Sequence, residues 1–152
     1  MRARVSGKEI YAHDGIRDTL THLAAPPYFY ESLRRQISLC KRHETYFSII
    51  RFVIECRGSK SDEAIVIFSE MLKHSFRYED LIARTGVFEF ALIFDGEEDL
   101  ADTISRRFIS RWCTQGIEGV TVSFATIEYR LNETLLSLLN RLDMKTLLSL
   151  EF

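Results

Sequence analysis

The order in which hydrophobic periodicities follow one another constrains the fold of this chain more than any single motif. Apolar residues spaced three or four apart from Phe29 to Cys40 predict a helix that begins near Pro26. An Ile-, Val- and Phe-rich run over residues 47–56 predicts a buried strand. We expect the rest of the chain to form a helix over 62–76, strands over 81–84 and 88–94, a helix from about 99 to 113, a strand over 120–129 and a helix over 133–149 capped by Asn132.

These eight elements predict an α+β fold. The inner six, in the order strand-helix-strand-strand-helix-strand (β-α-β-β-α-β), follow the ferredoxin-like pattern of an antiparallel sheet with helices on one face. The first and last helices flank this core. We expect residues 1–15 to be a polar tail or the end of a linker, and residues 16–152 to form a single domain.

The composition excludes several classes of function. With 20 Lys and Arg against 22 Asp and Glu, the net charge of -2 gives no overall attraction to nucleic acid or to anionic lipid. No apolar stretch approaches the ~20 residues of a membrane span, and no signal peptide is recognisable. The three cysteines form no close pair and the four histidines have no metal-ligand spacing. We therefore expect a cytoplasmic domain with no metal and no cofactor.

Three short segments carry a more specific signal. Residues 18–29 read D-T-L-T-H-L-A-A-P-P-Y-F, residues 80–90 read D-L-I-A-R-T-G-V-F-E-F, and residues 120–124 read V-T-V-S-F. In this order they resemble the D-x-L-T-G-L-x-N-R-x-x-F opening, the D-x-x-x-R-x-G-G-D-E-F hairpin and the V-T-V-S-I strand of GGDEF domains, the diguanylate cyclases. The resemblance implies a GGDEF-type antiparallel sheet core and a role in bacterial signal transduction.

The departures from this family concern its active site. Active members condense two GTP molecules into cyclic di-GMP with two metal ions held by carboxylates, and at those carboxylate positions this chain has Arg51, Val53 and Phe88. Mg²⁺ requires oxygen ligands, and an arginine repels it. Val87 also replaces the second hairpin glycine, and the segments that bind the base and the phosphates are not readable. The resemblance therefore implies a degenerate domain without cyclase activity.

One functional element of the family is retained. Arg77 and Asp80 match the R-x-x-D of the inhibitory site, nine residues before the hairpin glycine Gly86. An arginine donates well to O6 and N7 of guanine, and a carboxylate accepts from its N1–H and N2–H₂. In the family cyclic di-GMP binds there as a stacked dimer, often with an arginine from the helix after the hairpin, for which Arg106 and Arg107 are the candidates. The resemblance thus predicts a cyclic di-GMP receptor; a local ion pair is the simpler alternative.

Three other functions stay open. Asp62 and Gly86 align with residues of the family's GTP site, which suggests a regulatory domain that binds GTP without turnover; an acid in the first turn of a helix is also explained by the helix dipole. Alternatively, the hairpin and the first helix form a surface for homodimerisation or for a partner signalling domain, with no nucleotide. In the third alternative, the domain is an active cyclase in which Glu55 and Glu89 serve as metal ligands in place of the family's carboxylates. We expect Asp18 to cap the first helix.

Overall fold

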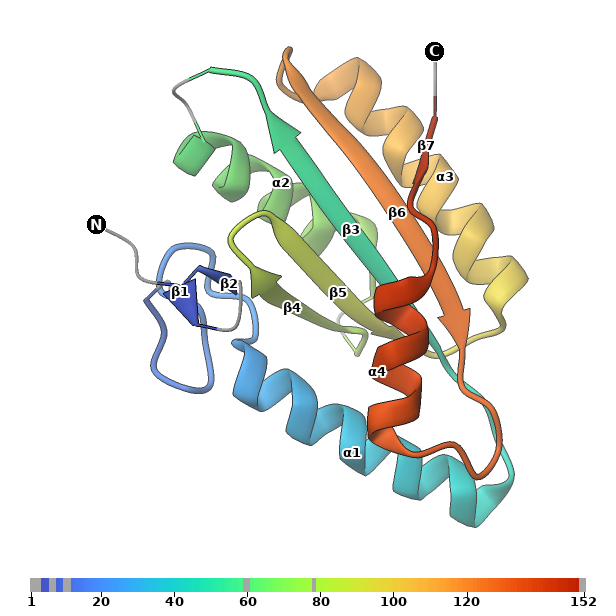
Figure 1. Cartoon of the computed structure of the whole chain (residues 1–152). Helices are drawn as coiled ribbons and strands as arrows, with labels where there is room; N and C mark the ends of the chain where they lie inside the picture. The colour runs from blue at the N-terminus through green and yellow to red at the C-terminus, as the bar shows by residue number, and fades with distance from the viewer. Residues whose placement is uncertain (1–3, 6–7, 10–11, 59–60, 78, 151–152) are drawn as a thin grey trace.

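A five-stranded antiparallel sheet in the order β4-β5-β3-β6-β7 organises the chain (Figure 1). The computed structural model describes residues 4–5, 8–9, 12–58, 61–77 and 79–150. The strands of the sheet are β3 (Ser48–Cys56), β4 (Leu81–Gly86), β5 (Glu89–Phe94), β6 (Val120–Glu128) and β7 (Leu148–Ser149). The helices are α1 (Pro26–His43), α2 (Ser61–Ser75), α3 (Glu98–Gln115) and α4 (Leu135–Met144). The α+β fold with a β-α-β-β-α-β core, expected from the sequence, is confirmed.

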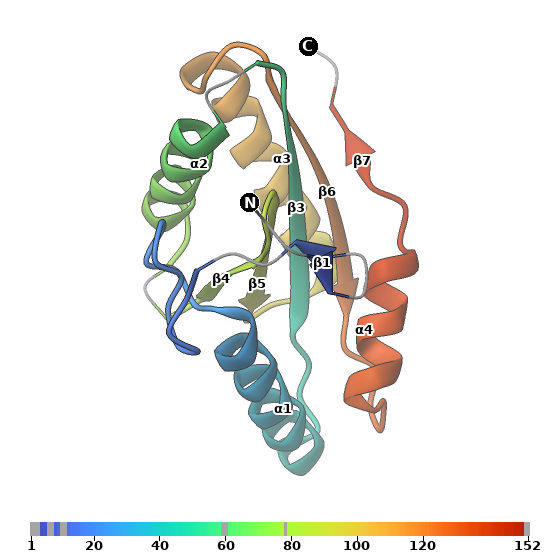
Figure 2. The same ribbon diagram turned by 60° about the vertical axis from the view of Figure 1, so that its left-hand side comes forward.

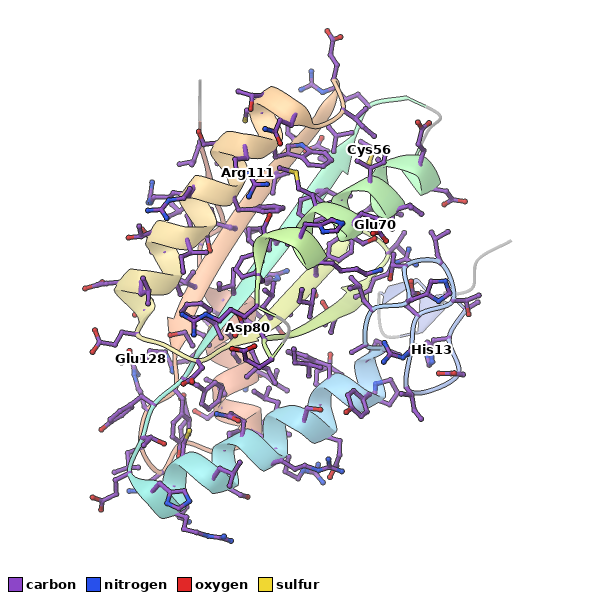
Figure 3. All side chains as sticks on the ribbon, turned by 180° about the vertical axis from the view of Figure 1, so that it is seen from behind. His13, Cys56, Glu70, Asp80, Arg111 and Glu128 are labelled. Carbon is purple, nitrogen blue, oxygen red and sulfur yellow. The ribbon has the colours of Figure 1, made fainter. Side chains whose placement is uncertain are left out.

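The central strand, β3, anchors the hydrophobic core. In β3, Phe52 is fully buried and pairs with Phe90 of β5 on one side and Phe124 of β6 on the other. The helices of the core, α2 and α3, cover the face of the sheet that these rings occupy (Figure 3). Phe68 of α2 and Phe108 of α3 meet Phe52 there, with ring centroids 5.9 and 5.2 Å away. This aromatic cluster is the larger of two hydrophobic cores.

The opposite face of the sheet is covered by the flanking helices α1 and α4 (Figures 1 and 2). Side chains alternate between the two faces of a strand, so Ile49 contacts this second core while its neighbour Ile50 contacts the first. Phe47 and Tyr129 stack within it at a centroid distance of 5.3 Å. Farther along β3 the same face carries Arg51 and Glu55, so it becomes polar toward the end of that strand.

The C-terminal helix is shorter than the sequence predicts. Residues 133–149 were expected to be helical with Asn132 as the cap, but α4 begins at Leu135 and ends at Met144. Asn132 has a left-handed φ of 67°, and the cap is Thr134, whose hydroxyl accepts a hydrogen bond from the Ser137 amide at 3.1 Å. The expected last turns instead pass into β7, which pairs with the edge of β6.

A buried ion pair joins the segment before α1 to the β4–β5 hairpin. Asp18 was expected to cap α1, but its carboxylate is fully buried and accepts from Arg84 at 3.1 Å. The same carboxylate accepts from the amide and the hydroxyl of Thr21, and Arg84 also donates to the Val87 carbonyl at 3.0 Å. The cap prediction is therefore wrong, because Asp18 bonds across the chain to the hairpin rather than to the helix.

The expectation of a polar N-terminal tail over residues 1–15 falls partly outside the described residues. Within the described part, β1 (Arg4–Val5) and β2 (Lys8–Glu9) pair with each other as a short antiparallel ribbon. Across the residues that the structure describes, the helices are all too short or too polar to cross a bilayer.

Removing one partner of the buried pair should strongly destabilise the fold. We expect Asp18→Ala to lower the free energy of unfolding by about 3–5 kcal/mol, because it leaves the Arg84 guanidinium buried without this carboxylate. Urea unfolding measures this loss, and Asp143→Ala, at an exposed aspartate of α4, is the control with little change. The double variant Asp18→Ala, Arg84→Met should recover part of the loss. A single variant no less stable than the control would contradict this role.

Candidate functional site

The residues singled out by sequence lie at two opposite ends of the edge strand β4. Arg77 and Asp80 precede the first residue of β4, whereas Gly86 ends it. Six residues of β-strand span about 20 Å, so the R-x-x-D loop and the hairpin form separate locations. Asp62 stands in the first turn of α2, while Arg77 follows the last turn of the same 15-residue helix. The structure therefore does not bring Asp62 together with Arg77.

The R-x-x-D loop is closed by the carboxylate of Asp80. Its Oδ2 accepts from the Arg77 amide at 3.2 Å, and the Asp80 amide donates to the Arg77 carbonyl at 3.1 Å. Asp80 is buried, whereas the Arg77 side chain is exposed. No side-chain ion pair joins the two among the described contacts, so the arginine is not held by its own aspartate. Tyr78, between them, lies outside the described residues.

Burial shifts the pKa of Asp80. Loss of solvent around the carboxyl raises the pKa of Asp80 above its usual range, and the amide and charge of Arg77 partly offset this rise. A carboxyl whose pKa is raised on folding favours the folded state more at pH values below that pKa. A hydrogen-bond donor brought to this carboxyl would stabilise its ionised form and so offset the effect of burial.

A cavity of about 470 Å³ opens beside this loop. Its volume falls in the range of about 300–1,000 Å³ that is typical of ligand pockets. Arg77, Asp80 and the start of β4 line this cavity together with the segment before α1 and residues of α1 and α2. Its lining comprises Ile16, Arg17, His22, Leu23, Ala24, Tyr28, Lys73, Arg77, Asp80, Leu81 and Ile82. Arg17, His22 and Lys73 come from distant segments, and no motif in the sequence points to them.

The arginines expected on α3 point to different sides of that helix. Arg106 donates to Asp102 at 2.8 Å and lies over the Phe124 ring at 5.4 Å. Arg107 is rotated by about 100° and shares a flank with Arg111, four residues later. Arg111 donates to Ser75 at the end of α2 at 3.2 Å. Figure 3 labels Arg111, on α3, and Asp80, in the loop before β4. Neither Arg106 nor Arg107 lines the cavity.

At the other end of the sheet, a guanidinium occupies the face where the resemblance places metal-binding carboxylates. Arg51 donates to Oε1 of Glu89 through two nitrogens at 2.8 and 2.9 Å, and the Thr85 hydroxyl donates to Oε2 at 2.7 Å. The side chains of Arg51 and Glu89 are only 18% and 23% exposed. These residues do not fit a divalent cation, because the carboxylate that faces this position is already neutralised by an arginine.

The hairpin itself is filled by hydrophobic side chains. Phe88 and Phe90, two residues apart, both pack against the core under α2 and α3, as the alternation of side chains along a strand requires. Val87 is buried in the same core. A Cβ on Gly86 would lie 3.1 Å from that of Glu89, so this position favours glycine. Within the described residues, no group of three or more His, Cys, Asp and Glu side chains is placed to hold a metal.

Comparison with solved structures agrees with this architecture. The chain is similar to the GGDEF domain of DgcB from Caulobacter crescentus in complex with c-di-GMP, with a TM-score of 0.77 and 19% identity over 88% of this chain and 89% of that one. It is also similar to the diguanylate cyclase SiaD in complex with its activator SiaC from Pseudomonas aeruginosa, with a TM-score of 0.74 and 25% identity over 84% of this chain and 55% of that one. For the FimX GGDEF domain from Pseudomonas aeruginosa, the TM-score is 0.74 and the identity 15%, over 84% and 88% of the two chains.

The chain has the fold of a GGDEF domain. Neither protein-family models nor the sequences of curated proteins match it. The chain thus has the GGDEF fold at low sequence identity to these structures.

The pairing of Arg51 with Glu89 on the GGDEF-type hairpin is expected to stabilise the sheet. In a double-mutant cycle of Arg51→Met and Glu89→Gln, we expect a coupling energy of about 1 kcal/mol, because both side chains are mostly buried. Urea unfolding of the four proteins measures it. The exposed pair of Arg35 with Glu31 on α1, 3.8 Å apart, serves as the control cycle with a smaller coupling. Equal couplings in the two cycles would contradict the prediction.

Proposed function

We propose that this GGDEF-fold domain is a regulatory receptor for cyclic di-GMP that binds the ligand through Arg77 and Asp80 and does not synthesise it. The observation that carries the proposal is the exposed Arg77 side chain, which lines a cavity of ligand size next to a buried, backbone-anchored carboxylate. The DgcB domain, which has the same fold, was solved in complex with c-di-GMP. That similarity supports the ligand class.

The chemistry of the two side chains suits guanine. The Arg77 guanidinium has five N–H donors in a planar fork and can donate to O6 and N7 of the base. Asp80 accepts one hydrogen bond from the Arg77 amide, and a carboxylate has further lone pairs for the N1–H and N2–H₂ groups. These donors would stabilise an ionised carboxylate whose pKa is raised by burial.

The lack of synthesis is supported at the other end of the sheet. Arg51 occupies the face on which a cyclase would need a divalent cation, and its positive charge is directed at Glu89. Phe88, in the third position of the family motif, offers no oxygen ligand. The alternative in which Glu55 and Glu89 act as metal ligands requires Glu89 to leave both Arg51 and Thr85.

Isothermal titration with cyclic di-GMP tests the receptor. We expect binding near 1 μM, about -8 kcal/mol, that weakens at least tenfold in Arg77→Ala and in Asp80→Asn. Asp80→Asn keeps an oxygen for the Arg77 amide but places a donor where guanine needs an acceptor. The control is Arg34→Ala, at an arginine that is 67% exposed on α1.

Two results would overturn this proposal. One is the absence of cyclic di-GMP binding by the unmodified domain, and the other is unchanged binding in both variants. If GTP alone binds, the domain is a GTP-binding regulator, and Asp62 and Gly86 are the candidate binding residues. If neither nucleotide binds and sedimentation depends on concentration, the domain is a protein-interaction module. That second candidate is favoured by the 69% and 85% exposure of Leu136 and Met144 on α4.

Incubation with GTP and Mg²⁺ or Mn²⁺ tests the lost synthesis. We expect no cyclic di-GMP by liquid chromatography, because the Arg51 guanidinium pairs with Glu89 and would repel a divalent cation on that face. Product that disappears in Glu89→Ala but persists in Glu118→Ala, an exposed control, would support the alternative of an active cyclase.

A further inference from the structure

The cavity beside Asp80 is also lined by basic residues that the R-x-x-D motif does not include. Arg17 and His22 belong to the segment before α1, and Lys73 belongs to the last turn of α2. Segments separated by about fifty residues in the chain thus face one cavity. We propose that Arg17, His22 and Lys73 form a phosphate-binding wall, so that one cyclic dinucleotide bridges this wall and the R-x-x-D loop. This inference rests on the proposed function.

The charge of the lining is opposite in sign to that of such a ligand. Three permanent cations, Arg17, Lys73 and Arg77, line the cavity with a single carboxylate, that of Asp80, and the Glu70 carboxylate beside Lys73 reduces the local excess to one positive charge. The chain as a whole carries a net charge of -2, so this cavity is a local exception. A cyclic dinucleotide has two phosphodiester groups and therefore two negative charges. Glu70, outside the lining, pairs with Lys73 at 2.9 Å and is the acid that competes with a phosphate.

The cations are positioned by backbone contacts. Lys73 donates to the Thr21 carbonyl at 2.7 Å, and Arg17 donates to the His22 carbonyl at 3.0 Å. With the bond to Glu70, Lys73 uses two of its three donors, and Arg17 uses one of its five, so donors remain for phosphate oxygens. Preorganised donors lose less conformational entropy when a ligand binds.

The loop before α1, which carries Arg17 and His22, is fixed to the core. His22 has a left-handed φ of 60° at the tip of a turn, and its amide donates to the Asp18 carbonyl at 2.9 Å. The Asp18 carboxylate bonds the amide of Thr21 and pairs with buried Arg84. A ligand held between the wall and Arg77 therefore contacts two loops that are both anchored at strand β4.

An aromatic ring completes the cavity. Tyr28, in the first turn of α1, lines it and is 38% exposed. Its ring offers a flat surface on which a purine base can stack, which is a common mode of binding bases without reading their sequence. One guanine on Arg77 and Asp80 and the other on Tyr28 would place the phosphates between them, opposite Arg17 and Lys73.

Isothermal titration of the whole chain with cyclic di-GMP tests the wall. We expect Arg17→Ala and Lys73→Gln each to weaken binding about tenfold, because each removes a charged hydrogen-bond donor to phosphate. Lys73→Arg should retain the affinity. Glu70→Gln should raise it about two- to threefold, because the competing carboxylate is removed. If Lys73 only stabilised the fold and did not contact the ligand, Glu70→Gln would not raise the affinity. Arg34→Ala is the control, and thermal unfolding verifies that each variant is folded.

The outcomes separate this inference from the proposed function. Unchanged affinity in Arg17→Ala and Lys73→Gln, with loss in Arg77→Ala, overturns the wall and leaves the receptor. If the unmodified chain does not bind cyclic di-GMP, titration with inorganic pyrophosphate follows. Pyrophosphate binding that weakens in Arg17→Ala then supports the wall while the receptor fails, and silence for both ligands overturns both.

Discussion

The buried pair of Asp18 and Arg84 is the interaction on which the rest of the structure depends. Two charges removed from water are costly unless their remaining donors and acceptors are satisfied. Here Asp18 also accepts from Thr21, and Arg84 also donates to the Val87 carbonyl. The pair therefore fixes the turn of the hairpin and the loop before α1 with one set of hydrogen bonds.

The same pair protects an edge of the sheet. β4 is the outermost strand on its side, and an exposed edge offers unpaired amides and carbonyls to other chains. Beside Arg84, the Ala24 amide donates to the Ile82 carbonyl and the Arg84 amide donates to the Ala24 carbonyl. The loop before α1 is thereby placed along β4, where it also becomes a wall of the cavity next to Asp80.

Sequence periodicity predicted most of the fold because burial on both faces leaves a strong signal. The Ile-rich run of β3 and the apolar stripe of α1 were located to within a few residues. The end of the chain was not, because a stretch rich in leucine is compatible with both a helix and a short edge strand. Asp18 was misassigned because a polar residue near a helix start resembles a cap, and only the fold brings Arg84 to it.

The candidate site was predictable only as far as it is local in sequence. Arg77 and Asp80 are three residues apart and were predicted from their resemblance to a family motif, whereas Arg17 and Lys73 come to the same cavity only through the tertiary fold. On α3, a rotation of about 100° per residue separates Arg106 from Arg107, and sequence alone does not tell which flank faces α2. A local motif therefore points to Arg77 and Asp80, and only the structure shows that Arg17 and Lys73 line the same cavity.

The two ends of β4 impose different requirements on the side chains. Metal-dependent chemistry at the hairpin needs carboxylates held close together, and such a cluster is unstable without its cations because like charges repel. Arg51 removes that requirement, since its guanidinium neutralises Glu89 within the protein itself. The hairpin conformation is stabilised by this pairing within the protein. Because Arg84 connects this hairpin to the loop that carries Arg17 and His22, the cavity next to Asp80 is held in place by hydrogen bonds and ion pairs within the protein.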